Sequence, residues 1–185
     1  MNPIFLAAAD VQQFCDAQGW RFCFIGALAV IRWGEPRLTQ DVDLTILTGF
    51  GGEERYVDAL LGRFNPRRED ARRFALQYRV VLLESGAIPV DVALGAMPFE
   101  EHAVERATAW PLSDGTAIRT CSAEDLIVFK AFAGRDKDWL DLEGIILRQG
   151  VRLDTNLIVE ELGPLLDLKG TAEDLARLER LFHEM

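Results

Sequence analysis

The stretch FIGALAVIRWGEPRLTQDVDLTIL, from Phe24 to Leu47, decides the fold. Polar and apolar residues alternate along a predicted strand over residues 40–47, with Val42, Leu44 and Ile46 on one face and Asp41, Asp43 and Thr45 on the other. Successive side chains of a strand point to opposite faces. The pattern therefore predicts a strand with one buried apolar face and one face that presents two carboxylates.

The residues before this strand predict a tight turn beside it. An aromatic run at 20–25, almost without charge, predicts a buried strand that Gly26 closes, and residues 27–33 predict a short helix. Gly34 and Pro36 end that helix. This order can bring a glycine turn and helix N-terminal N–H groups next to the two carboxylates, and such N–H groups bind phosphate well.

Two carboxylates at positions i and i+2 of a strand lie about 7 Å apart, a spacing that a divalent cation can bridge. Hard oxygen ligands suit Mg²⁺ or Mn²⁺. A third carboxylate, Asp91, interrupts the apolar run IPVDVAL at residues 88–94. If that strand lies beside residues 40–47, Asp41, Asp43 and Asp91 converge, and three carboxylates can hold two metal ions about 3.5 to 4 Å apart.

Each of these features also has a simpler interpretation. A DxD pattern on a strand is often only a solvated sheet face. Asp91 could instead cap a loop or pair with an arginine. As a separate feature, arginines crowd one short stretch of the chain: Arg63, Arg67, Arg68, Arg72, Arg73 and Arg79. That stretch could form a local basic groove or a solvated surface.

The rest of the chain predicts an α+β half followed by a helical half. We expect a mixed sheet flanked by helices over about residues 1–120 and a C-terminal helical region over 121–185, packed on the first. The predicted elements are a helix from Pro3, capped by Asn2, to Gly19; a helix at 53–64; hairpin strands at 75–84 and 88–94; a strand at 116–119; and helices from Ser122 to Ala133, at 136–148, at 155–168 and from Thr171.

Charge and composition limit the class of protein. A net charge of −10 over 185 residues argues against non-specific binding of DNA or RNA, which relies on clustered Lys and Arg. The three cysteines are widely spaced among apolar neighbours, which favours a reducing compartment. We find no basic leader and no run of about 20 apolar residues, so we expect a cytoplasmic protein without a membrane partner.

Lys130 stands within an apolar helical stretch and shares a face with Leu126 and Phe129. A lysine in that position needs an anion, or its head reaches water while its stem packs. Arg135 and Lys137 could add to the same site, although Lys137 and Asp141 also have the spacing of an ordinary helix contact.

Gly26-Ala27, Asp41-Val42-Asp43 and Asp91 together resemble the glycine turn, DxD and third acid of the DNA polymerase β-like nucleotidyltransferases. The chain is most similar to AbiEii/AbiGii-type toxins and minimal nucleotidyltransferases. The segment SAEDLIVFKAFAGRDKDWLDL, residues 122–142, resembles their helical part. The resemblance implies that Asp41, Asp43 and Asp91 are catalytic metal ligands, and that Gly26, Ala27, Lys130 and Lys137 bind the nucleotide. Ala27 departs from the usual Gly or Ser, so a hydroxyl contact to phosphate is lost.

The sequence and the resemblance therefore predict Mg²⁺- or Mn²⁺-dependent transfer of a nucleotidyl group from a nucleoside triphosphate to a hydroxyl. The acceptor could be RNA, a protein side chain or a small molecule, and likeness to the toxins implies an antitoxin partner. Because of Ala27, a rival is a catalytically degenerate binding or regulatory protein with this fold. A metal-dependent phosphohydrolase is a weaker rival, because no histidine is near the acids in the sequence.

Overall fold

A computed structural model describes residues 2–36, 38–113 and 115–184 of the chain. The chain divides into two compact units. The first contains residues 1–28 and 38–121, and the second contains 29–37 and 122–185. The sequence predicts two successive segments that meet near residue 121. In the structure, residues 29–37 also belong to the helical unit, which the sequence does not predict. The two units are described separately below.

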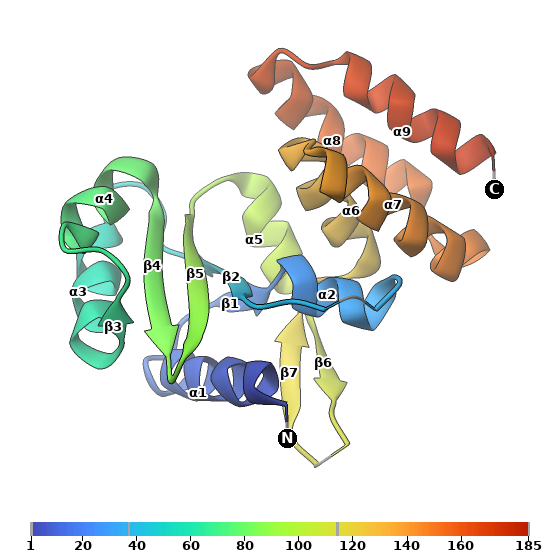
Figure 1. Ribbon diagram of the computed structural model, residues 1–185. Coiled ribbons are helices and arrows are strands. Elements are labelled where there is room, and N and C mark those ends of the chain that lie inside the picture. Colours follow the sequence, from blue (N-terminus) through green and yellow to red (C-terminus); the bar gives the residue numbers. More distant parts are fainter. Residues whose placement is uncertain (1, 37, 114, 185) are drawn as a thin grey trace. The chain divides into compact units, whose positions relative to one another are not determined.

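The first unit is built on a mixed sheet with strand order β3-β4-β5-β2-β1-β7-β6 (Figure 1). The strands are β1 (Phe22–Phe24), β2 (Val42–Leu47), β3 (Asn65–Pro66), β4 (Val80–Ser85), β5 (Ile88–Gly95), β6 (Thr108–Pro111) and β7 (Ala117–Thr120). The strand β2 runs parallel to β5 and antiparallel to β1. The α+β fold predicted from the sequence is confirmed, and β2 lies inside the sheet rather than at an edge.

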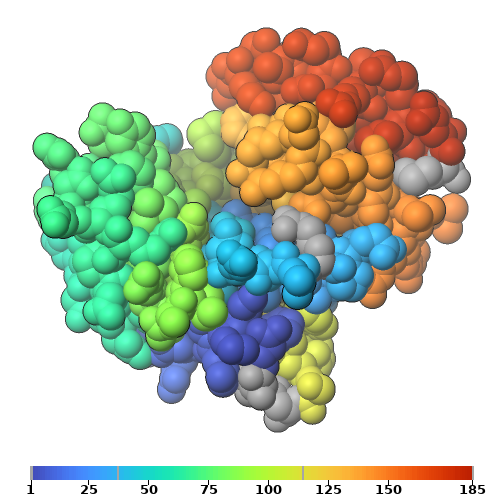
Figure 2. Space-filling view, in the orientation of Figure 1, coloured from blue at the N-terminus to red at the C-terminus, as the bar shows by residue number. Residues whose placement is uncertain are grey.

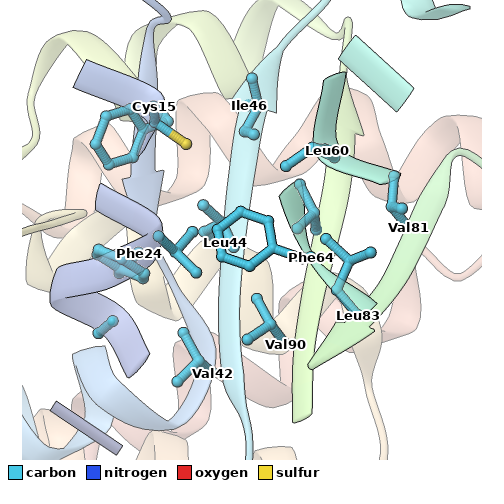
Figure 3. Packing of buried hydrophobic residues seen from close by; sticks show 14 of the residues in the cluster. Cys15, Phe24, Val42, Leu44, Ile46, Leu60, Phe64, Val81, Leu83 and Val90 are labelled. Atoms are coloured by element: carbon cyan, nitrogen blue, oxygen red, sulfur yellow. The ribbon is translucent and has the colours of Figure 1, made fainter. Parts of the chain in front are cut away.

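The alternation along β2 gives the sheet its two faces. Val42, Leu44 and Ile46 are fully buried, as the pattern predicts, whereas Asp41 and Asp43 are partly exposed. Figure 3 shows Leu44 beside Phe24 of β1 and Phe64, within the cluster that also takes Val81 and Leu83 from β4. Burying these side chains together provides the main driving force for this unit. It leaves the opposite face of β2 and β5 to carry polar groups.

The helices of the first unit are α1 (Pro3–Ala17), α3 (Glu53–Arg63), α4 (Ala71–Tyr78) and α5 (Pro98–Glu105); α2 (Gly26–Trp33) begins in this unit and ends in the second. The Asn2 side chain accepts a hydrogen bond from the Ile4 N–H at 3.1 Å, which confirms the predicted cap of α1. Residues of α1 and α3 join the core cluster on the apolar face of the sheet. The helix α5 contacts β1 and β2, and its Glu100 accepts a hydrogen bond from Thr45, which lies on the other face.

The prediction of a strand beginning at residue 75 is wrong, because residues 71–78 form the helix α4. Their sequence, ARRFALQY, is rich in good helix formers and buries Ala71 and Ala75 on one side. The helix ends at Arg79, whose φ of +56° lies in the left-handed region. Only after that residue does β4 begin. The short elements β3, α5 and β6 are also absent from the sequence prediction.

The second unit contains α6 (Ala123–Ala133), α7 (Asp136–Gln149), the short 3-10 helix η1 (Gly150–Arg152), α8 (Thr155–Lys169) and α9 (Glu173–His183). The Ser122 hydroxyl accepts the Asp125 N–H at 3.0 Å, and Gly134 ends α6 with φ +68°, both as predicted. Residues 29–37 join this unit through bonds such as that from Arg148 to the Gly34 carbonyl, 2.5 Å. None of the helices in the described part of the chain is both long and apolar enough to cross a bilayer.

Candidate active site

Gly26 and Asp43 fit against each other at the start of α2. Gly26 has φ +55°, and a Cβ at this position would overlap the Asp43 carboxylate. The Ile25 N–H donates to the Asp43 carbonyl at 2.9 Å, which aligns the turn with β2. A glycine is therefore required here by its backbone conformation and by the close approach of Asp43. Ala27, the next residue, is buried and has no hydroxyl to offer a phosphate.

Asp43 and Asp91 lie directly opposite each other on adjacent strands. They are register partners in the parallel pair of β2 and β5. Neighbouring strands lie about 4.8 Å apart, and paired residues of a parallel ladder project from the same face. The predicted site requires the strand of Asp91 to lie beside the strand of Asp43. The pairing of β5 with β2 meets this requirement, and the two carboxylates share one face of the sheet.

Asp41 lies just before β2 and is oriented by its neighbour Thr39. The Thr39 hydroxyl donates to the Asp41 carboxylate at 2.7 Å. Burial raises the pKa of Asp91, the positive charge of Arg67 opposes that rise, and the negative charge of Asp41 adds to it. The negative charges of Asp41 and Asp91 are thus close enough to repel each other. The face that carries Asp43 consequently concentrates negative charge on a partly buried surface.

Arg67 forms an ion pair with Asp91. The sequence allows an arginine as the partner of Asp91 but does not indicate which one. Arg67 follows β3, and its N–H donates to the Leu82 carbonyl of β4 at 3.0 Å. The segment around residues 60–80 lies at the surface and is teal to green in Figure 2. Asp91 therefore has a cationic partner in addition to facing the other acids.

The three acids do not form a ready-made metal centre in this conformation. Across residues 2–36, 38–113 and 115–184, no group of three or more His, Cys, Asp or Glu side chains is positioned to hold a metal ion. The donor types nevertheless fit a hard divalent cation, since the residues present are carboxylates with unfavourable mutual repulsion. Metal binding at Asp41, Asp43 and Asp91 stays a prediction.

Lys130 belongs to the second unit and already has two anionic partners. Its ammonium donates to Asp138 at 3.0 Å and to Asp141 at 2.7 Å, and its side chain is only 6% exposed. Arg135 also donates to Asp138, at 2.6 Å. Burial alone would raise the pKa of Asp138, but the hydrogen bonds from Arg135 and Lys130 outweigh it and lower that pKa. The carboxylates that pair with Lys130 thus come from α7. Lys137, the other lysine predicted to bind the nucleotide, is exposed on that same helix.

Comparison with known proteins decides the family. A family model described as "Nucleotidyl transferase AbiEii toxin, Type IV TA system" matches residues 14–184. The chain belongs to the AbiEii nucleotidyltransferase family. No curated protein matches the chain.

One solved structure supports the AbiEii assignment at the level of the fold, and two others are similar to the chain. An antigenic nucleotidyltransferase-like protein from Paracoccidioides brasiliensis is 16% identical with a TM-score of 0.50, and the match covers 97% of this chain and 95% of that one. The antibiotic-resistance factor ANT(2'')-Ia, in a solution structure, is 17% identical with a TM-score of 0.43, over 97% and 90% of the two chains. A crystal structure of ANT(2")-Ia with adenylyl-2"-tobramycin gives 19% and 0.42, over 94% and 93%.

Two residues of the candidate site in this AbiEii-family chain were not identified from the sequence. Thr39 gives no pattern of its own, and its bond to Asp41 depends on the local conformation before β2. Arg67 was included in the arginine-rich stretch but without a partner. Its place beside Asp91 could have been found only from the pairing of β3 with β4 and of β4 with β5.

Proposed function

We propose that the chain transfers a nucleotidyl group from a nucleoside triphosphate to a hydroxyl, in a reaction that depends on Mg²⁺ or Mn²⁺ and releases pyrophosphate. Family membership supports the class of reaction. The single observation that carries the proposal is the register of Asp43 and Asp91 on β2 and β5, with Gly26 pressed against Asp43. Together they form an acidic face beside a glycine turn that opens a helix.

In this proposal Asp41, Asp43 and Asp91 hold the metal. A bound divalent cation would supply charge neutralisation at the triphosphate and lower the pKa of the acceptor hydroxyl. Gly26 allows Asp43 to approach the start of α2, and Thr39 orients Asp41. The N–H groups at the start of α2, near Gly26 and Ala27, are suited to a phosphate.

Lys130 is left out of the phosphate-binding groups, which revises the role expected from the resemblance. A buried ammonium with two carboxylate partners would have to give up both to bind a phosphate, and breaking a buried pair is costly. Lys137 is exposed, and its role in nucleotide binding stays a prediction. The acceptor would be RNA, a protein side chain or a small molecule, and the type IV toxin–antitoxin family suggests an antitoxin as partner.

The test is transfer of label from each α-labelled nucleoside triphosphate to a whole-cell extract with Mg²⁺. The wild type is expected to label one class of acceptor, and the labelled species identifies the base and the acceptor together. Asp43→Asn should abolish labelling, whereas Asp58→Asn, an exposed acid on α3, should retain it. If the wild type binds a triphosphate but labels nothing, the degenerate regulatory protein becomes the better account.

A further inference from the structure

Arg67, Leu82, Asp91 and Asp43 form a continuous row across the sheet. The Arg67 N–H bonds to the Leu82 carbonyl, Leu82 is the register partner of Asp91 in β4 and β5, and Asp91 is the partner of Asp43 in β5 and β2. The backbone thus positions Arg67 at the end of the row that contains two of the three site acids. Its guanidinium reaches past Leu82 to the Asp91 carboxylate.

Arg67 differs from Arg68, Arg72 and Arg73, the arginines that follow it in the chain. Arg68 and Arg73 pair with Asp70, and Arg72 pairs with Glu54 and Asp58. Those side chains are 43%, 80% and 49% exposed, and such surface pairs contribute little to stability. The Arg67 side chain is 27% exposed, and its partner belongs to the proposed site.

A guanidinium and a divalent cation compete for the same carboxylate. Both bind the oxygen lone pairs of Asp91 and both bring positive charge, so a cation that binds Asp91 must displace Arg67 or be repelled by it. A guanidinium displaced from Asp91 can pair with another anion instead. The planar fork of arginine matches phosphate oxygens particularly well, and a triphosphate bound to the same site provides them.

We propose that Arg67 is a nucleotide-binding residue that changes partners: it covers Asp91 while the site lacks nucleotide and binds a phosphate of the triphosphate when the metal-bound nucleotide enters. This inference rests on the proposed function, because it assumes that Asp91 serves the metal. It explains why the three acids are not gathered around an empty ion position in the described conformation. It also couples metal entry to nucleotide entry, since the cation alone must compete with Arg67.

The test measures two affinities in Arg67→Gln, with Arg68→Gln as the matched control. Binding of Mn²⁺ alone is followed by the electron paramagnetic resonance of the free ion. Binding of the α,β-nonhydrolysable analogue of each nucleoside triphosphate is then followed by titration calorimetry with saturating Mn²⁺. Arg67→Gln should bind Mn²⁺ on the order of tenfold more tightly than the wild type and the analogue on the order of tenfold more weakly. Arg68→Gln should match the wild type in both.

The opposite signs of the two effects separate this role from a merely structural one, because general damage to the fold would weaken both. Arg67→Lys, which keeps the charge but not the fork, should bind Mn²⁺ like the wild type and the analogue more weakly. If Arg67→Gln matches Arg68→Gln in both affinities, the inference is wrong while the proposed function stands. If the wild type binds no analogue with Mn²⁺ present, both are wrong.

Discussion

The two units each contain a cluster of acidic and basic side chains, and the clusters differ in how their charge is balanced. In the second unit, Lys130 and Arg135 neutralise Asp138 and Asp141, and both carboxylates are nearly inaccessible. In the first unit, Asp41, Asp43 and Asp91 share one face, which remains partly exposed, and Arg67 pairs with Asp91. A balanced buried cluster holds helices together, whereas an accessible face with excess negative charge is suited to bind a cation.

The comparison predicts its largest effect at the buried cluster. Lys130→Met should reduce the free energy of unfolding by about 3 to 5 kcal/mol, because it leaves two carboxylates of α7 buried without their ammonium partner. Urea denaturation measures the loss. Lys137→Met, on the exposed side of α7, is the control and should change stability by no more than about 0.5 kcal/mol. A loss below about 1 kcal/mol for Lys130→Met would contradict the structural role.

Substitution on the acidic face should affect activity strongly and stability little. Asp43→Asn should reduce nucleotidyl transfer at least about 100-fold, since even the outer partners of metal ligands contribute 10- to 100-fold. Its free energy of unfolding should stay within about 1 kcal/mol of the wild type, because removing one of several like charges relieves repulsion. Steady-state kinetics and urea denaturation on the same preparation provide both numbers. Retention of full activity would remove Asp43 from the site.

Gly26→Ala tests the contact that shapes the acidic face. The substitution places a methyl group against the Asp43 carboxylate at a positive φ, so it should cost about 1 to 2 kcal/mol of stability and also reduce transfer. Gly86→Ala is the matched control, because Gly86 also has a positive φ but an added Cβ there meets nothing within 4 Å. Equal activity in the two variants would show that the approach of Gly26 to Asp43 is unimportant for function.

The smallest predicted effect is on the pH dependence of stability. Asp138 and Asp91, one from each cluster, should change the free energy of unfolding with pH in opposite directions. The pKa of Asp138 is lowered in the folded protein, so its contribution to stability is present above about pH 3.8 and is lost as the pH falls through the folded pKa. The pKa of Asp91 is raised, so its contribution favours the folded state at low pH and is lost as the pH rises through the folded pKa.

Unfolding free energies measured from pH 3 to pH 7 check both signs. Relative to the wild type, Asp138→Asn should be most destabilised near neutral pH and least at pH 3. Asp91→Asn should show the reverse trend. A parallel pH profile for the two variants would mean that the clusters do not differ in charge balance.

The sequence predicted the parts of the fold that local patterns encode. The alternation along β2, the caps at Asn2 and Ser122, and the left-handed Gly134 each depend on neighbouring residues, and each was found as predicted. The helix α4 was missed because its arginines were interpreted as a basic surface and its end at Arg79 depends on a left-handed non-glycine residue.

Contacts between distant segments could not be predicted in the same way. The sequence indicated that Asp43 and Asp91 would meet only if two strands were adjacent, and the register of β2 and β5 supplies that fact. The pairing of Arg67 with Asp91 depends on two further strand registers. The partners of Lys130 are 8 and 11 residues away on another helix, so their approach depends on how α6 packs against α7.

Calorimetric titration of the four nucleoside triphosphates into the wild type and Asp43→Asn, with Mg²⁺ and with EDTA, tests the central claim most directly. The account predicts that the wild type binds at least one triphosphate only when Mg²⁺ is present and that Asp43→Asn loses this binding. Equal binding in EDTA, or undiminished Mg²⁺-dependent binding by Asp43→Asn, would contradict it.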